Sequence, residues 1–258
     1  MNLLLLDQDD LDGSGGACVR GRRARHVAEV LRGAPGDRIA VGLWRGAIGE
    51  GILREVGPDR ILLSVNLAGD PPPPSPVALL LALPRPKILR KVLQAVAAMG
   101  VKRLVLVGTY RVERSYFGSP LLEPAALEAE LRLGLEQGRD TVPPEVSLHR
   151  YFKPFVEDTL DGLFPPGREA RLLAHPGAPG RLDAVPAPGG SAAIAIGPEG
   201  GFTPYEAATL EARGFAPFSL GPRPLRVDVA VPFAVAQAEM WLRRATAEER
   251  SGSRRPPG

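Results

Sequence analysis

Four consecutive prolines at residues 71–74 constrain the fold of this chain more than any other stretch of its sequence. Proline lacks the backbone donor that a helix interior or a central strand needs, so neither element can pass through this segment. A run of prolines adopts a stiff, extended polyproline helix. The chain has 258 residues, which is long enough for two domains. We therefore expect a linker at residues 69–76, between a domain of residues 1–68 and a second domain that begins at residue 77.

The segment before the linker has the pattern of a small β-barrel. Residues 37–41, 46–53 and 60–65 are short strand-forming stretches. The tripeptides Pro-Gly-Asp, Trp-Arg-Gly and Gly-Pro-Asp mark the turns beside them. One helix, at about residues 22–32, is expected to interrupt the strands.

After the linker the pattern changes to strands that alternate with helices, over residues 77–246. This alternation predicts a parallel sheet that is covered on both faces by helices. The expected strands are residues 77–83, 104–107, 170–174, 192–196 and 215–220, and the expected helices are residues 87–99, 124–137, 204–213 and 231–243. Residues 247–258 end in a polar stretch rich in proline and glycine, and we expect them to form a disordered tail.

Composition excludes several classes of protein. The longest apolar runs are far shorter than the roughly 20 residues of a membrane span, and the N-terminal MNLLLLDQDD lacks the basic start of a signal peptide. The single cysteine, Cys18, cannot form an internal disulfide, and three scattered histidines make a metal site unexpected. A reducing cytoplasm is the expected location. The net charge of +3 permits an anionic partner without requiring one.

A glycine-rich loop, Gly-Pro-Glu-Gly-Gly at residues 197–201, directly follows an expected strand. In open α/β sheets, ligands bind at the carboxyl ends of the strands, where this loop lies. The next helix has its own start signal: Thr203 at the N-cap, Pro204 at the first position and Glu206 to complete a capping box. Such a start needs only one glycine before it. The other glycines indicate either close approach of a ligand or a tight strand-to-helix turn. The loop is neither a Walker motif nor a Rossmann fingerprint.

A second loop, Ser-Leu-Gly-Pro-Arg-Pro-Leu-Arg at residues 219–226, leads into the last helix. GPEGGF and SLGPRPLR together resemble the RsmE family, the rRNA uridine-N3 methyltransferases of the SPOUT superfamily. The segment from His26 to Arg32, followed by Gly36-Asp37, is similar to another family segment, as are Glu113-Arg114-Ser115 and Glu136-Gln137-Gly138-Arg139. The resemblance therefore extends through most of the chain.

The resemblance implies an α/β catalytic domain with a parallel sheet and a deep trefoil knot at residues 77–246. It also implies a PUA-like, RNA-binding β-barrel at residues 1–68. Members of the family are homodimers that methylate one uridine of small-subunit rRNA with S-adenosylmethionine. Carried over to this chain, the family's cofactor loops correspond to Leu173, Ala174, His175, Ile196, Gly197, Pro198, Glu199, Gly200, Gly201, Leu220, Gly221, Pro222 and Leu225.

The same resemblance suggests catalytic roles for Arg226, Glu199 and Asp228. Uridine N3 carries a weakly acidic proton, so methylation needs that proton removed or the resulting charge stabilised. The guanidinium of Arg226 can stabilise a uracil oxyanion, and Glu199 or Asp228 can orient the base or accept the proton. Two alternatives stay open: Arg226 binds an rRNA phosphate, or Glu199 only hydrogen-bonds backbone within the knot.

A basic cluster in the first domain is the expected RNA contact. It follows from the implied barrel that these cations bind phosphate, although a solvated surface is the alternative. The predicted RNA-binding residues are Arg22, Arg23, Arg25, His26 and Arg32.

The chain departs from the family pattern in two places. Residues 94–100 lack the family's Lys, Thr and Glu, and residues 227–230 read Val-Asp-Val-Ala, where the family has Thr-Glu-Thr-Ala. These departures leave cofactor binding intact but put the substrate and the handling of the proton in doubt. Methylation at another RNA position, or RNA binding without catalysis, therefore remain alternatives.

Overall fold

The computed structural model describes residues 2–185 and 190–252, with side chains described as far as residue 245. The chain divides into two compact units. The first consists of Met1–Pro73, Ala97–Gly100 and Glu128–Pro143, and the second of Pro74–Val96, Val101–Leu127 and Pro144–Gly258. The first unit therefore includes two segments that follow the proline run in sequence, which a simple division at residues 69–76 does not anticipate.

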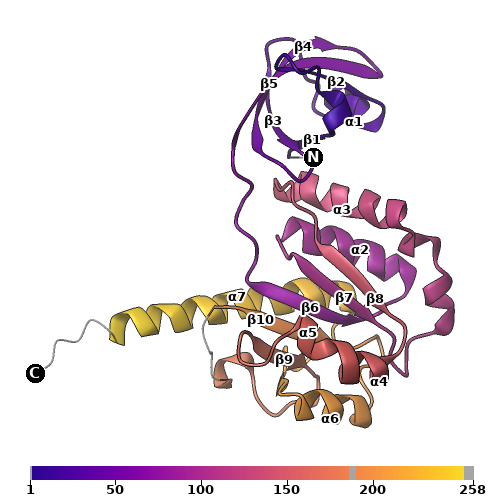
Figure 1. Ribbon diagram of the computed structural model, residues 1–258, viewed down its shortest axis with the longest axis vertical. Helices are drawn as coiled ribbons and strands as arrows, with labels where there is room; N and C mark the ends of the chain where they lie inside the picture. Colours follow the sequence, from indigo (N-terminus) through magenta and orange to yellow (C-terminus); the bar gives the residue numbers. More distant parts are fainter. Residues whose placement is uncertain (1, 186–189, 253–258) are drawn as a thin grey trace, which may run out of the picture. The chain divides into compact units, whose positions relative to one another are not determined.

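The first unit is built on a five-stranded sheet with the order β1-β3-β4-β5-β2 (Figure 1). Strands β1 and β3 are parallel, and the other neighbours are antiparallel. Two register shifts between β4 and β5 bend the sheet, as β-bulges do. The strands are β1 (Leu4–Leu6), β2 (Gly16–Arg20), β3 (Arg38–Leu43), β4 (Ile48–Val56) and β5 (Arg60–Gly69).

The three strands expected here are confirmed, whereas β1 and β2 were not anticipated. The expected helix at residues 22–32 consists of α1 (Arg22–Arg25) and a π-helical turn, His26–Val30. Its inner side supplies Ala24 and Val27 to the core of the unit. The strands supply most of the rest of that core, including Leu6, Val19 and Leu53.

The second unit contains a six-stranded sheet whose neighbouring strands are all parallel, with the order β11-β9-β10-β6-β7-β8. Its central strands are fully buried and apolar, as expected for a parallel sheet with both faces covered. The strands are β6 (Val77–Ala82), β7 (Arg103–Val107), β8 (Glu145–His149), β9 (Ala170–Ala174), β10 (Ala192–Ile196) and β11 (Ala216–Phe218). The predicted parallel α/β sheet is confirmed, and β8 is an addition to it.

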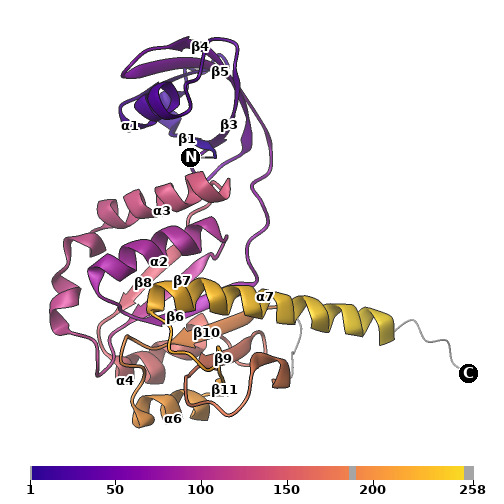
Figure 2. The ribbon, with the colours of Figure 1, turned by 180° about the vertical axis from the view of Figure 1, so that it is seen from behind.

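The longer helices are α2 (Pro86–Ala98), α6 (Pro204–Ala212) and α7 (Val227–Gly252), which belong wholly or mostly to this unit, and α3 (Pro124–Gly138), most of which belongs to the first unit. Helix α7 packs across β6 and β10 (Figure 2). Short helical segments, α4 (Phe152–Pro154), a π-helical turn (Phe155–Thr159) and α5 (Leu160–Leu163), were not predicted. Within the described residues, no helix combines the length and apolarity that a membrane crossing requires.

Helix α7 is longer than expected at both ends. It begins at Val227, and Pro232 lies in its second turn, where it removes only one backbone donor. It continues to Gly252, so the expectation that residues 247–252 belong to a disordered tail is wrong. The remaining part of that predicted tail, residues 253–258, lies outside the described residues.

Candidate functional site

A cavity of about 340 Å³ lies where β9, β10 and β11 end. Three loops surround it, at residues 174–176, 196–202 and 220–225, and the first turn of α7 closes one side. All three strands are parallel and adjacent, so their carboxyl ends meet at one edge of the sheet. This is the edge at which α/β proteins bind ligands.

The predicted cofactor residues gather at this cavity. All of them line it except Leu173 and Pro222, and Leu173 is buried within β9. Several lining residues were not predicted, of which Pro176, Phe202, Arg223, Pro224 and Val227 lie in or directly beside a predicted loop. The full set of unpredicted lining residues is Arg111, Pro176, Phe202, Arg223, Pro224, Val227 and Ala230.

The glycines of the first loop are required for different reasons. A Cβ on Gly197 would lie 2.8 Å from the backbone nitrogen of Phe202, so this residue lets the loop fold back on itself. Gly201 has a φ of +72°, which side-chain-bearing residues rarely adopt. A Cβ on Gly200 would lie 3.0 Å from the side chain of Arg111. At Gly197 and Gly201 the requirement for glycine comes from the backbone of the loop itself, and at Gly200 it comes from a side chain of another loop. All three requirements are met within the protein, which favours the interpretation of the loop as a tight strand-to-helix turn.

Polar groups line one part of the cavity. Glu199 accepts a hydrogen bond from Nε of Arg85 at 3.2 Å. Arg111 donates to the backbone oxygen of Gly200 and so ties a distant loop to the glycine loop. Nδ1 of His175 is buried and has no hydrogen-bond partner among the described residues. The cavity thus offers a carboxylate, a guanidinium and an unsatisfied ring nitrogen within an otherwise largely apolar lining.

The two remaining predicted catalytic residues form an ion pair beside the cavity. Arg226 donates to Oδ2 of Asp228 at 3.2 Å, and its side chain is 70% exposed. The side chain of Asp228 is only 6% exposed, and its Oδ2 also accepts from Nζ of Lys91 on α2 at 3.0 Å. The bond from Lys91 is the main cause that holds the pKa of Asp228 below its usual value. A carboxylate with a lowered pKa is a weak base, so this geometry favours Asp228 as the residue that orients Arg226.

The contact between Lys91 and Asp228 involves one of the two segments that depart from the family pattern and lies close in sequence to the other. Lys91 lies one turn before residues 94–100 on α2, and Asp228 lies within residues 227–230. Their contact joins the helix that follows β6 to the helix that follows the second loop.

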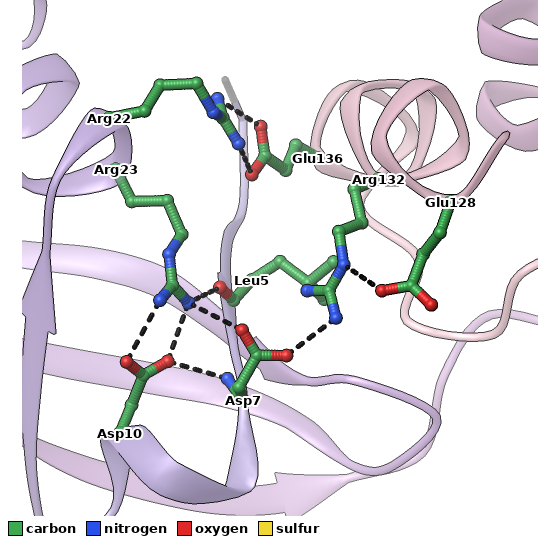
Figure 3. A network of polar contacts seen from close by, with 8 residues as sticks. All are labelled: Leu5, Asp7, Asp10, Arg22, Arg23, Glu128, Arg132 and Glu136. Carbon is green, nitrogen blue, oxygen red and sulfur yellow. Dashed lines mark hydrogen bonds and ion pairs between the residues drawn. The ribbon is translucent and has the colours of Figure 1, made fainter. Parts of the chain in front are cut away.

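In the first unit, two of the predicted RNA-binding arginines are engaged in ion pairs (Figure 3). Arg22 makes a two-pronged contact with the buried carboxylate of Glu136, at 2.6 and 3.1 Å. Arg23 contacts both oxygens of Asp10, at 2.6 and 3.0 Å, and donates to the backbone oxygen of Leu5. The side chain of Arg23 is only 18% exposed. Its guanidinium is thus already satisfied by the protein.

The other three predicted RNA residues are arranged differently. Arg25 is exposed, and among the described residues its one ion pair is with the still more exposed Asp59, with Nε and Oδ1 3.6 Å apart. Arg32 is exposed and has a φ of 53°. His26 is half-buried, burial lowers its pKa, and its Nε2 has no partner among the described residues. Arg25 and Arg32 are therefore the members of the cluster that are accessible to a phosphate.

Replacement of Arg23 with alanine should destabilise the first unit by about 1–3 kcal/mol, because Asp10 loses its charged partner in a mostly buried site. Replacement of Arg25 is the matched control and should leave stability nearly unchanged, since exposed ion pairs contribute little. Urea unfolding of the two variants measures the difference. An Arg23→Ala protein with normal stability but weaker RNA binding would restore the phosphate-binding role of Arg23.

A family model of the RNA methyltransferase domain matches residues 71–239, which is more than half of the chain. The chain therefore belongs to the RNA methyltransferase domain family. The match spans the six-stranded sheet and the loops of the cavity.

Relatives that match along nearly their full length make the resemblance specific. The chain is 28% identical over 264 residues to Ribosomal RNA small subunit methyltransferase E of Treponema pallidum, covering 100% of this chain and 98% of the relative. It is 26% identical to the protein of that name from Mycobacterium tuberculosis, covering 91% and 90% of the two chains. The resemblance to the RsmE family that the two loops indicate is thus confirmed.

Solved structures of similar proteins confirm the mixed α/β fold. The Ribosomal RNA small subunit methyltransferase E of Neisseria gonorrhoeae, solved with S-adenosylmethionine, is 20% identical with a TM-score of 0.71, covering 93% of this chain and 97% of that one. A methyltransferase of Legionella pneumophila, solved with its bound cofactor, is 21% identical with a TM-score of 0.69, covering 93% and 98%. At these identities the likeness establishes the fold and not the details of the site.

Proposed function

We propose that this protein transfers a methyl group from S-adenosylmethionine to N3 of a uridine in small-subunit rRNA. The observation that carries the proposal is the cavity at the ends of β9, β10 and β11. In a chain of the RNA methyltransferase domain family, it brings together nearly all residues of the loops expected to bind the cofactor. The names of the full-length relatives support the rRNA substrate.

The residues of the cavity suit S-adenosylmethionine. Its volume of about 340 Å³ lies within the range of small-molecule sites, roughly 300–1,000 Å³. Ile196, Leu220 and Leu225 offer an apolar wall for the adenine ring, and Arg223 and Glu199 offer charges of both signs to the amino-acid part and the sulfonium. The unsatisfied Nδ1 of His175 offers a further hydrogen bond. When bound, this cofactor supplies an electrophilic methyl group.

The remaining chemistry falls to side chains beside the cavity. As the N3–H bond of uracil breaks, negative charge develops on the ring and its carbonyl oxygens. Arg226, which Asp228 and through it Lys91 hold in place, donates hydrogen bonds to that charge. Glu199 lines the cavity and accepts the N3 proton or orients the base.

The finer features of the fold belong to the same proposal. Strand β9 lies between β10 and β11 in the sheet, although it precedes both in sequence, so three neighbouring loops and the following α7 come together at one edge. We propose that this part of the chain forms the deep trefoil knot of the SPOUT superfamily. We also propose that the bent five-stranded sheet of the first unit is a PUA-like domain that binds RNA through the exposed Arg25 and Arg32.

A homodimer is part of the proposal, and α7 carries the surface that favours it. Val229, Phe233 and Met240 lie on one face of this helix, at spacings of four and seven residues, and all three are exposed. A line of exposed apolar side chains on one helix is typical of an interaction surface. The protein is expected to act in the cytoplasm, where ribosomal subunits are assembled.

Replacement of Phe233 with aspartate should convert the dimer to a monomer, because a charge would be buried at the centre of the apolar face. The control is Leu133→Asp, which places the same charge on an exposed apolar position of α3. Light scattering coupled to size exclusion gives the mass of each variant. A Phe233→Asp protein that remains dimeric would move the interface away from this face of α7.

The function is tested with the wild-type protein, S-adenosylmethionine that carries a labelled methyl group, and small ribosomal subunits that lack the modification. Calorimetry first establishes cofactor binding, and label incorporation into rRNA then measures transfer. Labelled rRNA is the expected result. Cofactor binding without any transfer to rRNA would favour a different RNA substrate, and absence of both would overturn the proposal.

A further inference from the structure

A second hollow of the second unit, of about 980 Å³, lies at the carboxyl ends of β7 and β8. Three tyrosines line it, and their exposed fractions are high: 86% for Tyr110, 67% for Tyr151 and 63% for Tyr205. The chain has only four tyrosines. Aromatic rings this exposed gain nothing from the protein core, so their concentration in one hollow indicates a binding surface.

The accessible charge of this hollow is positive. Arg114, Arg150 and Lys153 line it, and the one ion pair of Lys153 within the described part of the chain is a long, exposed contact of 3.8 Å with Glu157. Among the described lining residues the one acid is Glu206, which is buried. Its two carboxylate oxygens accept the backbone N–H groups of Tyr110 and Thr203, at 2.7 and 2.8 Å. Glu206 therefore shapes the hollow without offering its charge to a ligand.

The wall of the hollow also contains an unsatisfied polar group. Thr109 is only 8% exposed, and its hydroxyl has no hydrogen-bond partner among the described residues. A buried hydroxyl without a partner costs folding free energy. Thr109 lines the hollow, so a ligand bound there would supply the missing hydrogen-bond partner of its hydroxyl.

The hollow adjoins the cofactor cavity. Within the loop that follows β7, Tyr110 lines the hollow and Arg111 lines the cofactor cavity. Two phenylalanines also separate the hollow from the cavity. Phe152 lines the hollow, Phe202 lines the cavity, and their ring centroids are 6.4 Å apart. An RNA strand that presents a base to the cofactor would therefore pass by the tyrosines.

We propose that this tyrosine surface, formed by Thr109, Tyr110, Arg114, Arg150, Tyr151, Lys153 and Tyr205, binds the unpaired nucleotides that flank the target base. Tyrosine rings stack on bases that have left a duplex, and cations between the rings pair with the phosphates. Thr109 donates to a base or ribose. The surface thus selects single-stranded RNA. This inference rests on the proposed function and names how the same site holds its substrate.

The test measures the affinity of the purified full chain for a fluorescent oligouridine of about 12 nucleotides, a length within the footprint of single-strand binders. Each of Tyr110→Ala, Tyr151→Ala and Tyr205→Ala should weaken binding by roughly 5- to 100-fold. The corresponding phenylalanine variants should bind nearly normally, because they keep the ring. Thr109→Val should weaken binding without lowering the melting temperature. Cofactor affinity, measured by calorimetry, should be unchanged in every variant.

The charges are tested by salt dependence. Arg150→Ala should flatten the plot of log affinity against log salt by about 0.7, the value for one phosphate contact on a single strand. Arg168→Ala is the matched control, since Arg168 is exposed in the same unit but lies outside the tyrosine surface. The control should retain the wild-type slope.

Binding of oligouridine is measured separately from methyl transfer, so failure of the proposed function and failure of this inference give different results. A protein that binds oligouridine through the tyrosines but methylates no rRNA would contradict the function alone. Unchanged oligouridine affinity in the triple tyrosine-to-alanine variant would overturn the inference. If that variant also lost affinity for intact small subunits, the surface would belong to a ribosomal protein contact instead.

Discussion

Replacing Arg226 with alanine should lower the single-turnover rate of methyl transfer by about 10²–10³-fold, the usual loss for one preorganised donor to a developing oxyanion. The guanidinium interacts more strongly with the transition state than with the neutral base, so the affinities for cofactor and RNA should fall much less. Arg226→Lys should recover only part of the rate, because an ammonium lacks the planar arrangement of donors. The measurement uses saturating cofactor and small ribosomal subunits.

Two further variants distinguish catalysis from general loss of charge. Asp228→Asn removes the ion pair that orients Arg226 and should lower the rate less than loss of Arg226 itself. Arg223→Ala removes a neighbouring cation of the same loop and should affect cofactor affinity more than the chemical step. If Arg226→Ala kept a near-normal rate but bound RNA much more weakly, Arg226 would be a phosphate anchor. The catalytic role would then fall to Glu199.

Replacing Arg171 with methionine should cost the second unit about 1–3 kcal/mol of stability, because the backbone oxygens that its guanidinium serves lose their charged donor. Arg171 lies on β9 and is 7% exposed. Its guanidinium bonds the carboxylate of Asp161 at 2.6 Å and the backbone oxygens of Phe164 and Arg213, at 3.0 and 2.5 Å. Chemical denaturation gives the change, with the exposed Arg168→Ala as control.

The same network predicts how acid affects stability. The hydrogen bond from Arg171 is the main cause that lowers the pKa of Asp161 from 3.8. A lowered carboxyl pKa contributes stability above the unfolded pKa, and that contribution is lost as the pH falls through the folded value. Below about pH 4 the wild type should therefore lose stability more steeply than Arg171→Met. Equal acid sensitivity in the two proteins would mean that Asp161 gains nothing from this contact.

The sequence predicted the elements whose signal is local. Strands β6 and β10 are continuous apolar runs that are buried on both faces, and the capping box at Thr203 marks the start of α6. Strand β8 was not predicted. Its residues, Glu-Val-Ser-Leu-His, lie at the sheet edge and are only partly buried, so they do not form a continuous apolar run. Strand β1 has only three residues, too few to show a period.

The residues of the candidate site were likewise predicted where their sequence signal is local. The cofactor cavity is built mainly from loops whose glycines and prolines are contiguous in sequence, so most of its residues could be predicted. Arg111 could not, because it reaches the cavity from a loop about 90 residues away and carries no local signal. For the arginine cluster of the first unit, the sequence shows the residues but not their partners. Its charge is visible in the sequence, but Glu136, the partner of Arg22, lies 114 residues further along the chain.

The most direct test of the central claim is the nucleoside content of small-subunit rRNA from cells that lack the gene for this protein. Mass spectrometry of digested rRNA identifies each methylated nucleoside, and mapping of fragments locates it. The account predicts that 3-methyluridine disappears from one position and returns when the wild-type gene is restored, but not when the Arg226→Ala variant is supplied. An rRNA modification profile identical to that of the parent cells would contradict it.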